Sequence, residues 1–110
     1  MGLINDICTN ENIKIISVTE ENAETLTRNS NNIGYGEAVL QGDKKYILYD
    51  RTAPIWEKKF TISHEIAHHL FGHLRLDSIL TAETREMEAN IFASVLVALM
   101  LYKEYENKID

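Results

Sequence analysis

Two histidines and a glutamate stand together in the segment His64-Glu65-Ile66-Ala67-His68. On a helix, side chains four residues apart lie on the same face, so His64 and His68 can present ring nitrogens to one metal ion. Glu65 is rotated by about a quarter turn from His64, which lets it reach a metal-bound water without being a ligand. The spacing predicts a zinc site with Glu65 as general base. The alternative is an ordinary amphipathic helix on which these residues coincide.

A catalytic zinc ion needs a third protein ligand and keeps its fourth position for water. Glu86 and Asn90 are four residues apart on a second expected helix, whereas Glu88 projects roughly 160° away from Asn90. This geometry favours Glu86 as the third ligand, with Asn90 hydrogen-bonded to the outer nitrogen of a ligand histidine. Alternatively, the acidic residues form only the solvated first turn of a helix.

The chain resembles the small zinc metallopeptidases grouped with ImmA and IrrE. The resemblance rests on residues 60–73, FTISHEIAHHLFGH, and residues 86–93, EMEANIFA. It implies a small zincin-like domain with His64, His68 and Glu86 as zinc ligands, Glu65 as catalytic acid/base, and Glu88 as the fallback ligand. Members commonly continue with a Leu-Leu-Met-Pro-like ending. Residues 95–99 here, VLVAL, contain no proline, so we expect the helix to run on.

The hydrophobic pattern indicates one α+β domain, residues 1–110, in which a short three-stranded sheet packs on the helix that carries the HExxH motif. A short N-terminal helix is followed by strands at 14–18, 34–40 and 45–49, and the last two strands form a hairpin. Residues 19–26 are expected to form a short helix or turn and residues 28–32 a polar loop. The active-site helix should follow Pro54 and end near Gly72, and the last helix should cover residues 82–106.

The composition is that of a soluble globular domain, with 45% hydrophobic and 25% charged residues. A net charge of -6 argues against a basic surface for nucleic acid. The chain has neither an apolar run long enough for a membrane span nor a signal-peptide pattern. Its single cysteine, Cys8, cannot form an internal disulfide, which suits a reducing compartment. We therefore expect a cytoplasmic protein that contacts neither nucleic acid nor membrane directly.

Other candidate residues receive supporting roles. His69 is offset by about 100° from His68, so we expect it at the surface or beside the site rather than on the metal. His73 is expected to cap the helix C-terminus. The strand tyrosines are expected to pack on the sheet, although one of them could donate its hydroxyl to an oxyanion; they are Tyr35, Tyr46 and Tyr49.

The last helix is apolar around much of its circumference. Core packing explains the stripe formed by Ile91, Val95 and Leu99. The apolar surface exceeds what one small sheet needs, so burial against a second copy is an open prediction. The expected oligomer is a homodimer through this helix.

These features predict zinc-assisted hydrolysis of a peptide bond, in which Glu65 takes a proton from the metal-bound water and returns one to the leaving nitrogen. An extended substrate is expected to add to the sheet edge near residues 46–49. The family resemblance implies that the substrate is a protein regulator, commonly a helix-turn-helix repressor of a phage or mobile element. Two alternatives stay open: a catalytically silent zinc-containing protein that sequesters a repressor, and a structural zinc domain.

Overall fold

The computed structural model of the chain describes residues 2–18 and 36–109. Its elements, in chain order, are α1 (Gly2–Asn10), β1 (Ile13–Val18), β2 (Gly36–Gln41), β3 (Lys44–Asp50), α3 (Ile55–Leu70) and α4 (Ala82–Ile109). The predicted strands and helices at these positions are confirmed to within a few residues at their ends. The helix or turn at 19–26, the loop at 28–32 and Tyr35 lie outside the described residues.

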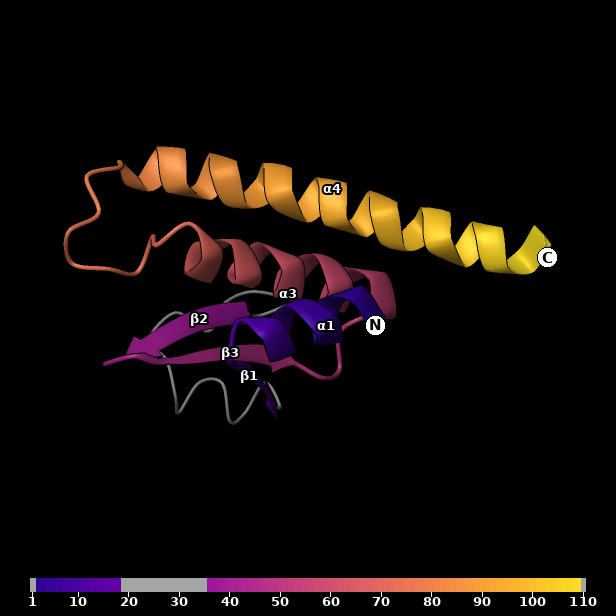
Figure 1. Cartoon of the computed structure of the whole chain (residues 1–110), viewed down its shortest axis with the longest axis horizontal. Coiled ribbons are helices and arrows are strands. Elements are labelled where there is room, and N and C mark those ends of the chain that lie inside the picture. Colours follow the sequence, from indigo (N-terminus) through magenta and orange to yellow (C-terminus); the bar gives the residue numbers. More distant parts are fainter. Residues whose placement is uncertain (1, 19–35, 110) are drawn as a thin grey trace.

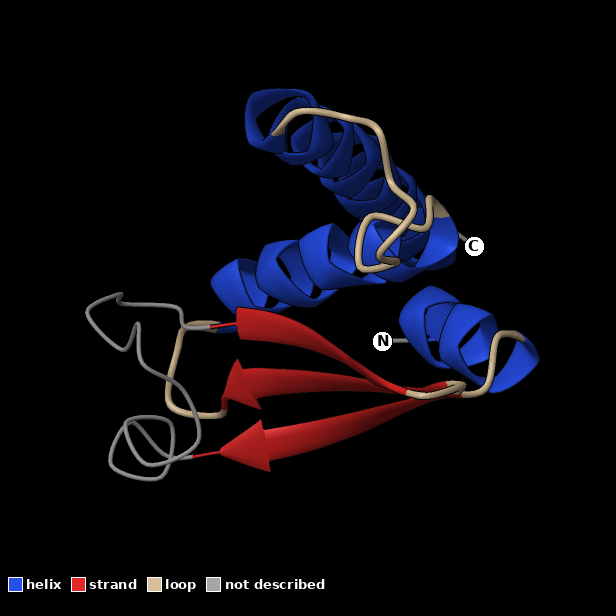
Figure 2. Cartoon of the chain, turned by 90° about the vertical axis from the view of Figure 1, so that its left-hand side faces the viewer, coloured by secondary structure: helices blue, strands red, loops and turns tan. Residues whose placement is uncertain are grey.

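The three strands form one mixed sheet in the order β1-β3-β2 (Figure 2). β1 runs parallel to β3, with Ile15 opposite Ile47, and β2 runs antiparallel to it, with Ala38 opposite Ile47. The hairpin between β2 and β3 turns at Gly42, whose φ of 63° is a left-handed value that glycine adopts without strain. The substrate edge expected near residues 46–49 is therefore wrong, because β3 is the central strand and is paired on both sides.

The helices lie in two layers over one face of the sheet. α1 and α3 lie against the sheet, and α4 covers the far side of α3 and runs in the opposite direction (Figure 1). The hydrophobic core contains residues from both helix layers and from the sheet. These residues are Ile4, Cys8, Ile13, Ile47, Ile62, Ile66, Leu96 and Met100. Full burial of one large apolar side chain stabilises the fold by about 1.5–3 kcal/mol. This cluster therefore fixes α3, and with it the HExxH segment, against the sheet.

α3 ends in a glycine cap that reverses the chain. Gly72 has a φ of 69°, and its N–H donates to the carbonyl of His69 at 3.3 Å, while the N–H of His73 donates to the carbonyl of His68 at 3.0 Å. These two bonds are those of the Schellman motif, in which a left-handed residue ends the helix. The predicted end near Gly72 is confirmed. The reversal of the chain places His73 beside His68.

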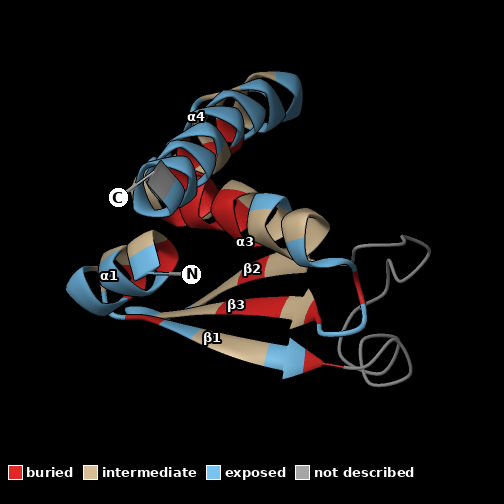
Figure 3. Cartoon of the chain, turned by 90° about the vertical axis from the view of Figure 1, so that its right-hand side faces the viewer, coloured by how far each residue is buried: buried red, intermediate tan, exposed pale blue. Residues whose placement is uncertain are grey.

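α4 has one buried side and one exposed side (Figure 3). Its buried apolar residues are Ala89, Ala93, Leu96 and Met100. The prediction that Ile91, Val95 and Leu99 pack in the core is wrong: they are 59%, 57% and 50% exposed. Ile91 follows Ala89 by two residues, which places it about 160° away around the helix. Burial of this stripe in a homodimer stays a prediction.

No helix within the described parts of the chain combines the length and the apolar character that a membrane span requires.

Candidate metal centre

His64, His68 and Glu86 converge on one point between α3 and α4. The Nε2 atoms of the two histidines, one helical turn apart, are 3.1 Å from each other. Carboxylate oxygens of Glu86 lie 2.9 Å from Nε2 of His64 and 3.3 Å from Nε2 of His68. Zinc ligands about 2.0–2.1 Å from a tetrahedral ion stand about 3.3 Å from one another. The three side chains are therefore spaced as the ligands of one zinc ion would be, without the fold having to move.

The outer nitrogen of His64 is also placed as a metal ligand requires. Its Nδ1 lies 2.9 Å from Oδ1 of Asn90. An amide oxygen only accepts hydrogen bonds, so Nδ1 of His64 donates to Asn90; in the neutral ring, Nε2 then carries the lone pair and faces the Glu86 carboxylate. Asn90 thus lies beside a ring nitrogen of His64, and its role in holding the tautomer stays a prediction. A carboxylate and an imidazole lone pair that face each other are complementary to a cation.

His68 lies deeper than His64, with only 9% of the residue exposed. Burial, followed by the charge of His64, lowers the pKa of His68 to about 4. Its ring is therefore neutral near pH 7, which is the form that binds a metal ion. The side chain of Glu86 is 58% exposed, so the centre is open to solvent on the side of this ligand.

Glu65 faces the same cleft and is 8% exposed. Burial raises the pKa of its carboxyl group to about 8; the Ala38 backbone N–H, which donates to it, acts in the opposite direction, and the charges of Glu86 and Glu37 raise it further. A carboxyl group with such a pKa can hold or release a proton near neutral pH. Its placement agrees with the role of general base predicted from the sequence, and the role itself stays a prediction.

The first residue of β2 allows the sheet edge to approach Glu65. A Cβ added to Gly36 would lie 2.1 Å from Cγ2 of Thr61 and 3.5 Å from Glu65. Any side chain there would collide with α3, so glycine is needed for the close contact. The sequence pattern gave no sign of this requirement, because the contact joins residues that are far apart in the chain.

Two hollows lie along β2 and meet at His68. A cleft of about 610 Å³ contains the predicted site residues and is also lined by Gly36, Glu37, Ala38, Phe60 and Arg85. A larger hollow of about 980 Å³ reaches the other half of β2 and is lined by Leu40, Leu70, Leu74 and Leu76 among others. The smaller cleft is the candidate site, since the larger one contains only His68 of the predicted site residues.

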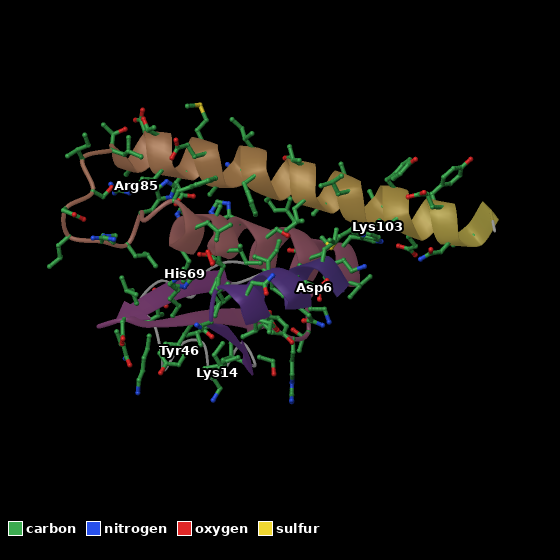
Figure 4. The ribbon with its side chains drawn as sticks, viewed as in Figure 1. Asp6, Lys14, Tyr46, His69, Arg85 and Lys103 are labelled. Atoms are coloured by element: carbon green, nitrogen blue, oxygen red, sulfur yellow. The ribbon has the colours of Figure 1, made fainter. Side chains whose placement is uncertain are left out.

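Two further histidines have roles that the sequence did not reveal. His69 is buried and points from α3 to the sheet, where its Nε2 bonds to the carbonyl oxygen of Tyr46 at 2.8 Å (Figure 4). The prediction that His73 caps the helix is wrong, because backbone groups form the cap. Its ring lies instead between His68, at 2.9 Å, and Glu88, at 2.7 Å. Glu88 therefore contacts His73 and is not part of the cluster of His64, His68 and Glu86.

The fold is that of a zincin-like, metallopeptidase-type domain. It combines a mixed sheet, a helix with the HExxH motif and a following helix that carries Glu86 as the third candidate ligand. The chain belongs to the IrrE N-terminal-like domain family, peptidase M78, whose model matches residues 9–107. Among the described residues, this match includes the three strands, the whole of α3 and all but the last two residues of α4, and it confirms the family resemblance. Comparisons with curated proteins and with solved structures give no significant match. The individual roles of His64, His68, Glu86 and Glu65 stay predictions.

Proposed function

We propose that this chain is a zinc-dependent endopeptidase that cleaves a protein regulator. The observation that carries the proposal is the buried carboxyl group of Glu65 beside three side chains with zinc-ligand spacing. Three protein ligands leave a coordination position open, as in catalytic rather than structural zinc sites. When bound, zinc would polarise the scissile carbonyl and make water acidic enough to be activated near pH 7.

Glu65 is the residue that moves protons in this proposal. The positive charge of a bound metal favours the carboxylate form, so Glu65 accepts a proton from the attacking water. It then gives a proton to the leaving nitrogen, which completes peptide hydrolysis. The Ala38 N–H holds the carboxylate, so that the proton acceptor keeps one orientation.

The outer edge of β2 is the surface on which a substrate can lie. Within residues 2–18 and 36–109, no strand pairs with this edge. Ala38 directs its N–H away from β3 to Glu65, and backbone direction alternates along a strand, so Gly36 and Leu40 present their backbone groups to the same side. An extended peptide can pair with this edge. It would then cross both hollows and pass the metal centre at their junction.

We propose a helix-turn-helix repressor of a phage or mobile element as the substrate. Support comes from the resemblance to the metallopeptidases grouped with ImmA and IrrE. The net charge of -6 adds an electrostatic argument, because DNA-binding domains carry basic surfaces that an acidic partner attracts. The same charge opposes contact with DNA itself, so the proposed partner is the repressor rather than its operator.

The test combines metal analysis with a cleavage assay on purified repressors encoded near the gene of this chain. Wild type should contain zinc and cut the repressor. His64→Ala should lose the metal, whereas Glu65→Gln should keep it and lose cleavage. Glu104→Gln, an exposed change near the end of α4, should behave as wild type. Normal cleavage by Glu65→Gln would refute the mechanism, and derepression by binding without cleavage would establish the sequestering alternative instead.

A further inference from the structure

We propose that His73 and Glu88 are positioning residues that set the tautomer of His68 and so prepare its Nε2 for the metal. Nδ1 of His68 lies 2.9 Å from Nδ1 of His73, and Nε2 of His73 lies 2.7 Å from Oε1 of Glu88. These contacts form one chain from the metal centre to the surface of α4. The inference rests on the proposed metal function but assigns residues that the HExxH motif and the third ligand do not include.

The direction of the two hydrogen bonds follows from what each group can donate. A carboxylate only accepts, so the proton between His73 and Glu88 belongs to Nε2 of His73. A neutral imidazole with a proton on Nε2 accepts at Nδ1, and the donor at that position must therefore be Nδ1–H of His68. Because His68 then carries its only proton on the outer nitrogen, the lone pair of its Nε2 faces the centre.

The surroundings of His73 favour this single arrangement. Only 1% of its side chain is exposed, whereas 41% of the Glu88 side chain is exposed. An unpaired donor or acceptor at the buried ring would destabilise the fold, so both ring nitrogens must keep their partners. The glycine cap at Gly72 fixes the backbone of His73 through its N–H bond to the carbonyl of His68. The ring is thus held beside His68 by backbone and side-chain contacts together.

The two ligand histidines are oriented by separate partners from the same helix. Asn90 accepts from His64 directly, and Glu88 acts on His68 through His73. Glu88 can therefore point away from the metal and still serve the site. When Nδ1 of His64 and Nδ1 of His68 both carry the proton, each Nε2 has a lone pair. These two lone pairs and the Glu86 carboxylate then face one point, and none of the three groups can donate a hydrogen bond. A cation satisfies all three groups, which explains why the arrangement prepares a metal site.

The first experiment reads the tautomers directly, by long-range ¹H–¹⁵N NMR of the full chain at pH 8, above the ordinary pKa of imidazole. In the metal-free wild type, His68 should carry its proton on Nδ1 and His73 on Nε2. His73 should keep that tautomer after zinc is added. Glu88→Ala should release the constraint and populate the other tautomer of both rings. A metal-free wild type with the His68 proton on Nε2 would overturn the proposal.

The second experiment measures zinc affinity by competition with a chelator. Loss of a group that orients a metal ligand typically weakens binding by about 10–100-fold, and we expect this loss for Glu88→Ala and for His73→Phe. His73→Asn should recover part of the affinity, because its amide oxygen can accept from His68. The matched control is Glu83→Gln, an exposed change earlier on α4, which should bind zinc as wild type does.

The outcomes separate this proposal from the proposed function. Wild-type affinity in both Glu88→Ala and His73→Phe would overturn the positioning role even if the wild type cleaves a repressor. Conversely, the assigned tautomers and weakened variants, found together with no cleavage by wild type, would refute the endopeptidase and leave the positioning role standing. A wild type without zinc affinity would overturn both.

Discussion

Replacement of the buried glutamate of the HExxH motif should stabilise the metal-free protein, and by an amount that depends on pH. Glu65→Gln keeps the shape of the side chain and an amide oxygen that can accept the Ala38 N–H, but it removes the ionisable group. The carboxyl group has an ordinary pKa of 4.5 and a pKa of about 8 in the fold. Any pH effect of the substitution must therefore arise between these two values.

The sign follows from proton binding by the two states. Below the ordinary pKa both states hold the proton, and Glu65 contributes no pH dependence. As pH rises from 4.5 toward about 8, the unfolded chain releases its proton while the folded one retains it, so the free energy of unfolding falls. Each pKa unit corresponds to about 1.4 kcal/mol. We expect Glu65→Gln to gain roughly 2–4 kcal/mol over wild type between pH 5 and pH 8.

The assay is denaturant unfolding of metal-free wild type, Glu65→Gln and the exposed control Glu104→Gln at pH 5 and pH 8. His68 titrates with the opposite sign, because burial lowers its pKa and the unfolded chain binds protons first as pH falls. This contribution is present in all three proteins and cancels in their differences. Equal differences between wild type and Glu65→Gln at both pH values would refute the buried, protonated carboxyl group.

Three other substitutions test the geometry of the centre. Glu86→Ala should abolish tight zinc binding, because it removes a ligand. Asn90→Ala should weaken zinc binding by only about 10–100-fold, because it removes a hydrogen bond to His64. Equilibrium dialysis measures both affinities, and equal losses would contradict the assignment of Glu86 as ligand and Asn90 as the support of His64. Gly36→Ala should separate β2 from α3, because the new Cβ would meet Cγ2 of Thr61 at 2.1 Å. We expect lower cleavage with zinc affinity retained, and unchanged cleavage would show that the close approach of β2 is not required.

The sequence predicted the parts of the centre that lie on one helix face. The spacing of His64 and His68, and of Glu86 and Asn90, is a local property of an α-helix, and in the structure these four side chains lie together. Strand order is not local. The sequence of β3 does not show whether the strand is central or at an edge, and only the pairing with β1 and β2 reveals that it is central.

The same limit explains the role of the segment after α3. His73 follows a helix end, a position typical of a capping residue, and nothing in the spacing connects it to Glu88 fifteen residues later. The connection arises from the glycine reversal at Gly72 combined with the packing of α4 on α3. A contact of this kind depends on two elements and a turn, so periodicity within one element cannot predict it.

The small residues of α4 link packing to chemistry. Ala89 and Ala93 have no exposed surface, and small side chains at an interface between helices allow their backbones to approach closely. Ala89 stands between Glu88 and Asn90, so this fully buried residue is flanked by the two residues that contact His73 and His64. A larger side chain at 89 would move α4 outward and lengthen the contacts of Glu86, Glu88 and Asn90 together. The segment 86–90 therefore acts as one unit, in which close packing of the alanine sets the distance between its three polar neighbours and the histidines that they contact.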